Sequence, residues 1–487
     1  MSSGSVHLLK QRLTPTGLPN TRSIYADRAL TFRRLSQSQI RCFGAAPMLR
    51  RQANLKEERV NLLSHDKNMP PLSLMPTPLL IRSFLMTCIM SNPRILDFAM
   101  PVMDKLSTTK SWPLNPDKNP LLKAAVRLGF YDYFAGGENL PEVRQKIQRL
   151  RGMGYHGAIL SFAKEVISEQ AIADLPVESE RAIQQWKSDN LRTIDMLGFD
   201  DILAVKYTGA GGVIAKALQV GEDPPETFQK ALTEVLDSCL EKGVRVFIDA
   251  EQQVFQDTVD KWTVDLMRRY NTPDKRTPNG CLVYTTLQAY LKKAPRRVNE
   301  FLQLAQAEGW TLGLKLVRGA YLSTERRDAI HDTKEQTDKT YDSIIRDILL
   351  EDVPGISKDN FPSVQIFVAT HNEDSVLKAL ALAKELEASG KLRSKLDYGQ
   401  LMGMADELGC RLIQETRRVN GDEHAKRILA PNPLKLTVWG SPQECMQWLL
   451  RRAVENRDAI ERATQWRMEF SNELWRRIKN IGRRGTA

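Results

Sequence analysis

Two adjacent arginines near the end of the chain have the type and spacing of a carboxylate clamp. Arg451 and Arg452 lie in residues 448–456, a stretch that we expect to be helical, and Glu455 follows Arg451 by four residues. Residues four apart share one face of a helix, whereas neighbours lie about 100° apart around it. Paired guanidiniums can hold a carboxylate through bidentate hydrogen bonds that lysine cannot reproduce. Taken alone, the stretch also fits an exposed helix with an ordinary ion pair.

Further polar and charged side chains directly follow apolar runs along the chain. In order, they are Lys206, Asp249, Glu251, Gln288, Tyr290, Lys292, Lys315, Arg318, Thr370, His371, Asn372 and Gln400. Such groups are costly to bury and are normally kept where a ligand binds. The set is cationic on balance, which favours an anionic cofactor or substrate.

The apolar runs alternate with amphipathic helical stretches, and this alternation predicts the fold. The expected strands are residues 156–162, 202–207, 244–248, 281–286, 312–317, 364–369, 396–401 and 435–439. Eight strands, each followed by a helix, favour a (β/α)8 TIM-type barrel, whose chemistry lies at the carboxyl ends of the strands. A doubly wound open sheet is the alternative, but its first strand usually leads into a Gly-rich phosphate loop. The glycine cluster at residues 209–212 lacks that spacing.

The domain organisation that we expect has three parts. Residues 1–43 form a transit peptide that extends to about residue 53. Residues 54–150 are mainly helical and punctuated by prolines, so we expect an N-terminal helical layer. Residues 151–487 form the barrel and end with the helix that carries the two arginines.

Composition excludes several classes of protein. The chain has 487 residues, of which 42% are hydrophobic and 26% charged, as in ordinary globular proteins. It has no uninterrupted apolar run of about 18 residues, so a membrane-spanning helix is not expected. The six cysteines form no CxxC pair, which fits a reducing compartment and argues against a zinc or iron–sulfur site.

The positive charge is concentrated at the N-terminus. Residues 1–53 hold nine basic residues and one acidic residue, a charge of +8 out of the net +11. A basic segment almost free of acids is typical of a mitochondrial transit peptide, with a cleavage site near residues 41–43. A disordered basic tail is the alternative. Because the remainder is only slightly basic, no nucleic-acid partner is expected.

Six motifs, in order, resemble the proline dehydrogenase family in its eukaryotic, mitochondrial form. They are Phe247-Ile-Asp-Ala-Glu-Gln252, Tyr284-Thr-Thr-Leu-Gln-Ala-Tyr-Leu-Lys292, Leu314-Lys-Leu-Val-Arg-Gly-Ala-Tyr321, Ala369-Thr-His-Asn372, Tyr398-Gly-Gln-Leu-Met-Gly-Met404 and Leu450-Arg-Arg-Ala-Val-Glu-Asn456. Each motif alone is a weak signal, but six in order on a barrel pattern are a strong one. The resemblance covers most of the chain from about residue 120 onward.

The resemblance implies a distorted (β/α)8 barrel with FAD at its mouth. It implies oxidation of L-proline to Δ1-pyrroline-5-carboxylate by hydride transfer to flavin N5. The electrons would pass to quinone, with peripheral contact to the matrix side of the inner mitochondrial membrane. No catalytic metal is implied.

The resemblance also assigns roles to individual residues. Arg451 and Arg452, with Lys206 as a third cation, would grip the carboxylate of proline, and Glu455 would hold the arginines. Asp249 would order the cationic cluster, and Leu401 would pack on the proline ring. Glu165 would form a gate over the site. The residues that would line the flavin, its ribityl chain or its phosphates are Gln288, Lys315, Val317, Arg318, Gly319, Thr370, His371 and Asn372.

One position departs from the family pattern. The family usually has a tyrosine four residues before the glycine that corresponds to Gly440, and this chain has Leu436 there. That tyrosine packs on the substrate ring and hydrogen-bonds within the arginine cluster. Its loss leaves room for hydroxyproline or another cyclic imino acid as the substrate. It also leaves open a weakened flavoprotein that binds proline without turning it over.

A metal-dependent barrel hydrolase is the alternative from another class. Asp249 and Glu251 could bind a metal ion, as carboxylates do in many barrel hydrolases. Two carboxylates and one histidine on distant strands are a thin set of ligands, however. That alternative predicts a colourless protein that chelators inhibit.

Overall fold

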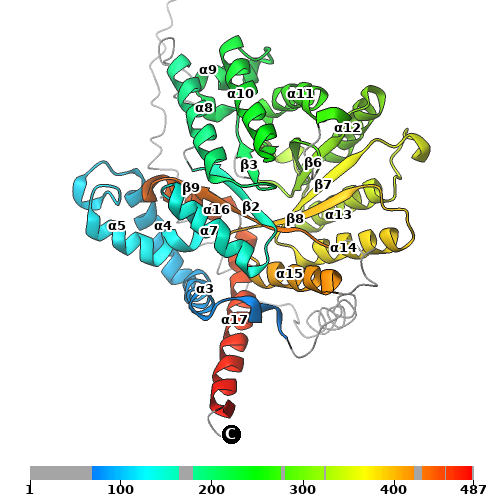
Figure 1. The fold of residues 1–487 in the computed structure, drawn as a ribbon. Helices are drawn as coiled ribbons and strands as arrows, with labels where there is room; N and C mark the ends of the chain where they lie inside the picture. Colours follow the sequence, from blue (N-terminus) through cyan, green and yellow to red (C-terminus); the bar gives the residue numbers. More distant parts are fainter. Residues whose placement is uncertain are drawn as a thin grey trace, which may run out of the picture. The chain divides into compact units, whose positions relative to one another are not determined.

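The computed structural model describes residues 69–163, 179–275, 280–322, 325–421, 430–455 and 457–484. Within them, parallel strands form one sheet in the order β1-β9-β2-β3-β4-β5-β6-β7-β8, and a further pairing of β9 with β8 closes it. The strands are β1 (Ala135–Gly137), β2 (Gly157–Phe162), β3 (Ile202–Val205), β4 (Arg245–Ile248), β5 (Val283–Gln288), β6 (Leu312–Val317), β7 (Val364–Ala369), β8 (Lys395–Leu401) and β9 (Pro433–Trp439). Strands β2 to β9 form the closed barrel (Figure 1).

Helices follow the strands and cover the outside of the barrel (Figure 1). They are α8 (Ser179–Met196), α9 (Gly212–Val220), α10 (Glu226–Lys242), α11 (Gln253–Tyr270), α12 (Ala294–Glu308), α13 (Lys334–Leu349), α14 (Glu373–Ala388), α15 (Asp406–Gly421), α16 (Pro442–Glu455) and α17 (Arg457–Arg484). Local signals fix several helix ends. The Thr333 side chain and Gln336 form a capping box that starts α13, and Gly243, in the left-handed region at φ 68°, ends α10.

Helices also dominate the part of the chain before β2. They are α3 (Thr77–Met90), α4 (Pro93–Thr108), α5 (Pro120–Val126), α6 (Asp132–Phe134) and α7 (Leu140–Met153), preceded by a single 3-10 turn, η1 (Pro71–Leu74). Helix α3 packs against the C-terminal helix α17 (Figure 1). Among the described residues, no helix is both long enough and apolar enough to cross a membrane.

The predicted (β/α)8 barrel is confirmed, and the bounds of its strands differ from the expected ones in places. The strand expected at residues 281–286 lies two residues later, at Val283–Gln288, so that Gln288 ends the strand instead of following it. The three-residue strand β1 was not expected, because Ala135-Gly136-Gly137 has no alternating apolar pattern. Strand β1 pairs with Val438 and Trp439 in the second half of β9, whereas β8 pairs only as far as Leu436. The barrel is therefore distorted where β8 and β9 separate near its mouth.

The inside of the barrel is filled below the mouth. A small apolar cluster of buried side chains occupies it: Ile159, Ile202, Ala204, Phe247, Cys281, Tyr284, Phe367 and Leu434. Near the amino ends of the strands, the fully buried Arg245 forms ion pairs with Asp200 and Asp397. This packing leaves the carboxyl ends of the strands as the end of the barrel that can bind a ligand.

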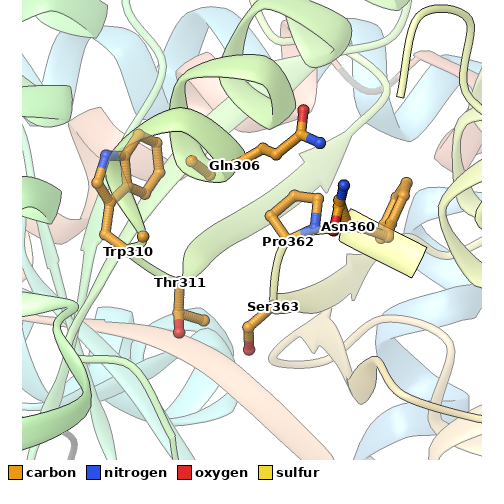
Figure 2. Close-up of a pocket in the computed structure, with 9 residues that line it drawn as sticks. Gln306, Trp310, Thr311, Asn360, Pro362 and Ser363 are labelled. Atoms are coloured by element: carbon orange, nitrogen blue, oxygen red, sulfur yellow. The ribbon is translucent and has the colours of Figure 1, made fainter. Parts of the chain in front are cut away.

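One pocket of about 440 Å³ lies at the opposite end of the barrel (Figure 2). Thr311 and Ser363, which precede β6 and β7, line it together with Trp310 and Pro362. The pocket therefore lies at the amino ends of these strands. It is separate from the mouth at which a barrel carries its chemistry.

Candidate active site

The register of the strands brings the predicted site residues to one end of the barrel. Val205 pairs with Ile248, and Gln288 pairs with Val317. Leu401 pairs with Leu436 on the other side of the barrel. Because all the strands are parallel, the residues that follow these pairs surround one mouth.

A buried ion pair lies inside the mouth. The Nζ of Lys315 lies 2.5 Å from Oδ1 of Asp249, and the two side chains are 7% and 19% exposed. The same Nζ lies 5.0 Å from the centre of the Phe247 ring, which closes the barrel beneath it. Asp249 therefore fixes the position of this cation.

The side chain of Gln288 forms hydrogen bonds to two loops of the mouth. Its Oε1 accepts from the backbone N–H of Ala320 at 2.9 Å, and its Nε2 donates to the carbonyl of Glu251 at 3.4 Å. The first of these bonds holds the turn at Gly319. A side chain at Gly319 would begin 2.5 Å from the ring of Tyr290, and φ is +148° there, so only glycine fits.

The buried carboxylate of Glu251 organises the loop after β3. It accepts from the backbone N–H of Thr208 at 3.1 Å and from the hydroxyl of the same residue. Burial raises the pKa of Glu251, and the hydrogen bonds from Thr208 and the charge of Lys206 oppose that rise. Lys206 is half-buried, and this electrostatic contact places it on the same side of the mouth as Glu251.

Arg318 is held rigidly between the ends of β6 and β7. Its Nε donates to Oδ1 of Asp338 at 2.7 Å, and one terminal nitrogen donates to the hydroxyl of Ser375 at 2.8 Å. The other terminal nitrogen donates to the hydroxyl of Thr370. The guanidinium also lies 4.4 Å above the ring of Tyr341. A ligand would therefore meet a cation whose orientation is already fixed.

The imidazole of His371 is neutral, and a hydrogen bond from the backbone of Leu401 determines its tautomer. Its Nε2 accepts from the backbone N–H of Leu401 at 3.1 Å, so the proton of the neutral ring lies on Nδ1. Burial lowers the pKa of His371 to about 3, and the charges of Arg462, Lys435 and Arg318 contribute. The next residue, Asn372, caps α14, because its side chain accepts from the backbone N–H of Ser375.

An apolar wall lies at the ends of β8 and β9. Leu401 and Leu436 are register partners, and both pack against a cluster that includes Trp448 and Leu449 of α16. Arg451 and Arg452 follow within the next turn of α16, where both are half-buried. The structure thus brings the predicted ring contact and the predicted carboxylate clamp to the same side of the mouth.

Some of the predicted residues cannot be compared. Glu165 lies outside the described residues, and the structure describes the backbone of Glu455 but not its side chain. Arg462, whose charge acts on His371, was not predicted, because it lies outside every motif in a helix with many charges. Among the described residues, no three His, Cys, Asp or Glu side chains converge as metal ligands would.

The fold and the mouth together define a class of protein. This is a (β/α)8 barrel whose carboxyl end carries fixed cations, an apolar wall and a helix with two adjacent arginines. The sequence model of the family described as "Proline dehydrogenase" matches residues 143–465. The chain belongs to the proline dehydrogenase family.

Individual relatives agree with this assignment. A Schizosaccharomyces pombe protein named "Probable proline dehydrogenase, mitochondrial" is 30% identical over 72% of this chain and 80% of its own length. Human "Proline dehydrogenase 1, mitochondrial" is 28% identical over 64% of this chain, which spans only 52% of that protein. Mouse "Hydroxyproline dehydrogenase" is 26% identical over 73% of this chain and 83% of its own length.

Solved structures support the fold. Proline utilization A (PutA) from Bdellovibrio bacteriovorus superposes with a TM-score of 0.58 at 16% identity. The match covers 82% of this chain and 40% of that longer one. At this identity the likeness bears on the fold alone.

Proposed function

We propose that this protein oxidises L-proline to Δ1-pyrroline-5-carboxylate with FAD as its cofactor. The observation that carries the proposal is the position of Arg451 and Arg452 on α16, within one turn of the residues of that helix that pack with Leu401 and Leu436. This arrangement suits a small apolar ring that bears a carboxylate. Membership of the proline dehydrogenase family supports the same reaction.

The residues of the mouth fit a flavin dinucleotide. Lys315, Arg318 and the Nδ1–H of His371 are donors suited to an anionic ligand that accepts many hydrogen bonds. Two buried polar side chains, Thr286 and Gln400, also have atoms without a hydrogen-bond partner among the described residues. Buried polar groups are normally paired, so partners from a ligand would account for both. When bound, FAD supplies the hydride acceptor.

The protein's own contribution is mainly positioning. The two guanidiniums would hold the substrate carboxylate, and the leucines would hold the ring carbons and exclude water. The amine of proline must be neutral, because its lone pair stabilises the developing iminium. Lys315, oriented by Asp249, would place positive charge where negative charge develops on reduction.

The leucine at position 436, where the family has a tyrosine, indicates an alternative substrate. A related protein is named as a hydroxyproline dehydrogenase, and Leu436 removes the hydroxyl that the family tyrosine supplies. Hydroxyproline or another cyclic imino acid is therefore the alternative substrate. Kinetics that show strong preference for unsubstituted proline would exclude it.

Replacing Leu436 with tyrosine should raise kcat/KM for L-proline about tenfold. The position is only half-buried, so a larger ring can extend into the mouth, and a restored hydrogen bond is worth about 1–3 kcal/mol. Steady-state kinetics of Leu436→Tyr and of Leu436→Phe measure the effect. The phenylalanine variant has the ring without the hydroxyl, so an equal gain in both variants would assign the effect to packing alone.

The proposed location is the matrix side of the inner mitochondrial membrane, with quinone as the electron acceptor. The mitochondrial names of the relatives and the basic segment at residues 1–53 support this location. A membrane contact is supported by exposed apolar side chains on α17, namely Trp475, Ile478 and Ile481, with the basic Lys479 among them. We also propose the domain boundaries stated above, with the barrel at residues 151–487.

The absorbance spectrum of the purified protein, before and after anaerobic addition of L-proline, tests the proposal. Flavin bands that bleach on addition are the expected result. Re-oxidation by a quinone in anionic lipid vesicles then tests the acceptor and the membrane contact. Bands that shift without bleaching would indicate a flavoprotein that binds proline without oxidising it. A colourless protein that FAD cannot reconstitute would overturn the proposal.

A further inference from the structure

Helix α4 packs against α16, the helix that carries the two arginines of the proposed clamp (Figure 1). Two glutamines of α16 donate hydrogen bonds across this contact. The Nε2 of Gln443 donates to the carbonyls of Leu106 and Thr109 at 3.2 and 2.8 Å. The Nε2 of Gln447 donates to the carbonyl of Ser107 at 2.6 Å. Both glutamines therefore bond to the backbone at the end of α4.

The carbonyls that accept these bonds lie where α4 itself supplies no partner. Helix α4 ends at Thr108, and the carbonyls of the last turn of a helix have no partner within it. Ser107 is 1% exposed, so water cannot readily replace the missing donor. A buried carbonyl without a hydrogen bond is costly. The contact is therefore specific: α16 must present its amides at a fixed height and rotation relative to α4.

The segment that follows α4 holds the start of α16 as well. The Nδ2 of Asn115, a buried residue, donates to Oε1 of Gln443 at 3.1 Å and to the carbonyl of Thr109 at 3.0 Å. The carboxylate of Asp117 accepts from the backbone N–H of Gln443 at 3.1 Å. Gln443 lies in the first turn of α16, whose amides have no partner within the helix. The start of α16 is therefore bonded to this segment through both a side chain and the backbone.

The spacing along α16 connects the two glutamines with the clamp. Gln443, Gln447 and Arg451 follow one another at intervals of four residues, and residues four apart share one face of a helix. Arg451 lies one turn beyond Gln447, which is about 6 Å along the axis, and Arg452 is the next residue. Because the backbone between them is one continuous helix, a shift or rotation of α16 at Gln447 displaces both guanidiniums.

We propose that Gln447, supported by Gln443, positions the carboxylate clamp by fixing α16 to the end of α4. Gln447 is a positioning residue that acts through Arg451 and Arg452 and needs no contact with the substrate or the flavin. Small displacements of such a clamp weaken its hydrogen bonds and misplace what it holds. The N-terminal helical layer thereby contributes to substrate affinity from outside the barrel. This inference rests on the proposed binding of proline by the two arginines.

The first test is Gln447→Met, which removes the donor and keeps the length of the side chain. We expect KM for L-proline to rise about three- to tenfold, the range that the loss of one hydrogen bond covers. The change in kcat should be smaller, because both arginines and the apolar wall remain. Steady-state kinetics of the holoenzyme measure both. Gln447→Lys should restore KM, because lysine again donates to the carbonyl and suits the negative end of α4.

A second comparison separates positioning from a general effect on stability. In a protein that already carries Arg451→Lys and Arg452→Lys, Gln447→Met should cause little further loss, because its effect passes through the arginines. The matched control is Gln414→Met on α15. Gln414 donates to the carbonyl of Met69 at 2.8 Å, so this variant removes the same kind of bond from a helix that does not carry the clamp. It should leave KM unchanged.

Three results would overturn the inference. They are an unchanged KM in Gln447→Met, an equal rise of KM in Gln414→Met, and a full further loss in the protein that lacks both arginines. Should Gln447→Met not fold, Gln447→Asn decides by the same comparisons, because its side chain is one methylene too short to reach the carbonyl. An unchanged protein whose flavin is not reduced by L-proline would instead overturn the proposed function, and this inference with it.

Discussion

Replacing both Arg451 and Arg452 with lysine should lower kcat/KM for L-proline by a factor of about 10³. Each arginine can make a paired, charge-assisted hydrogen bond to the carboxylate, and such bonds are worth about 1.5–3 kcal/mol each. Lysine keeps the charge but loses the planar fork, so binding and orientation both suffer. The loss should appear in KM and in kcat, because a misplaced ring also misplaces the carbon that gives up hydride. Stopped-flow reduction and steady-state kinetics measure both parts.

The matched control for this double variant is Arg467→Lys, which changes an exposed arginine on α17. It should leave the kinetics unchanged. The double variant should keep its flavin, because the flavin contacts that we propose are made by other residues. Kinetics equal to those of the unchanged protein would contradict the carboxylate clamp. Loss of flavin would show that the arginines support the cofactor site instead.

The barrel was predictable because a buried parallel strand leaves a short, continuous apolar run in the sequence. Strands β6 and β7 lie at the expected residues, 312–317 and 364–369. Strand β1 was not predictable, since it consists of an alanine and two glycines that gain strand geometry only by pairing with β9. Its position nevertheless matters, because it occupies the edge of β9 from which β8 has separated.

The grouping of the candidate residues near the carboxyl ends of strands was predictable from the pattern. Asp249 directly follows β4, and Lys315 lies within β6, two residues before its end. The structure adds the ion pair between them, which no local pattern could indicate. Arg462, whose charge acts on His371, could not be found in the same way, because it lies outside every motif on a helix rich in charges.

The contact between Glu469 and Glu407 leads to the second large effect, which depends on pH. Burial, together with the like charges of Glu407 and Glu373, raises the pKa of Glu469 to about 9. Glu407 and Glu373 are the acidic groups that face it, and Arg411 binds both of them. Between pH 4.5 and pH 9, the folded protein therefore keeps a proton that the unfolded chain has released. Stability from this group is fully present below about pH 4.5 and is lost as pH rises toward 9.

Glu469→Gln should remove this dependence and stabilise the protein by about 1–3 kcal/mol at pH 8, with little effect near pH 5. The amide can accept from Gln465 and donate to Glu407, so it reproduces both hydrogen bonds without taking up a proton. Thermal unfolding at several pH values measures the effect, and Glu385→Gln, an exposed change on α14, is the control. The stability that Glu469→Gln gains over the unchanged protein should be larger at pH 8 than at pH 5. An equal gain at both pH values would show that Glu469 is ionised in the folded protein. In that case the carboxylates of Glu469 and Glu407 would repel each other and weaken the contact between α17 and α15.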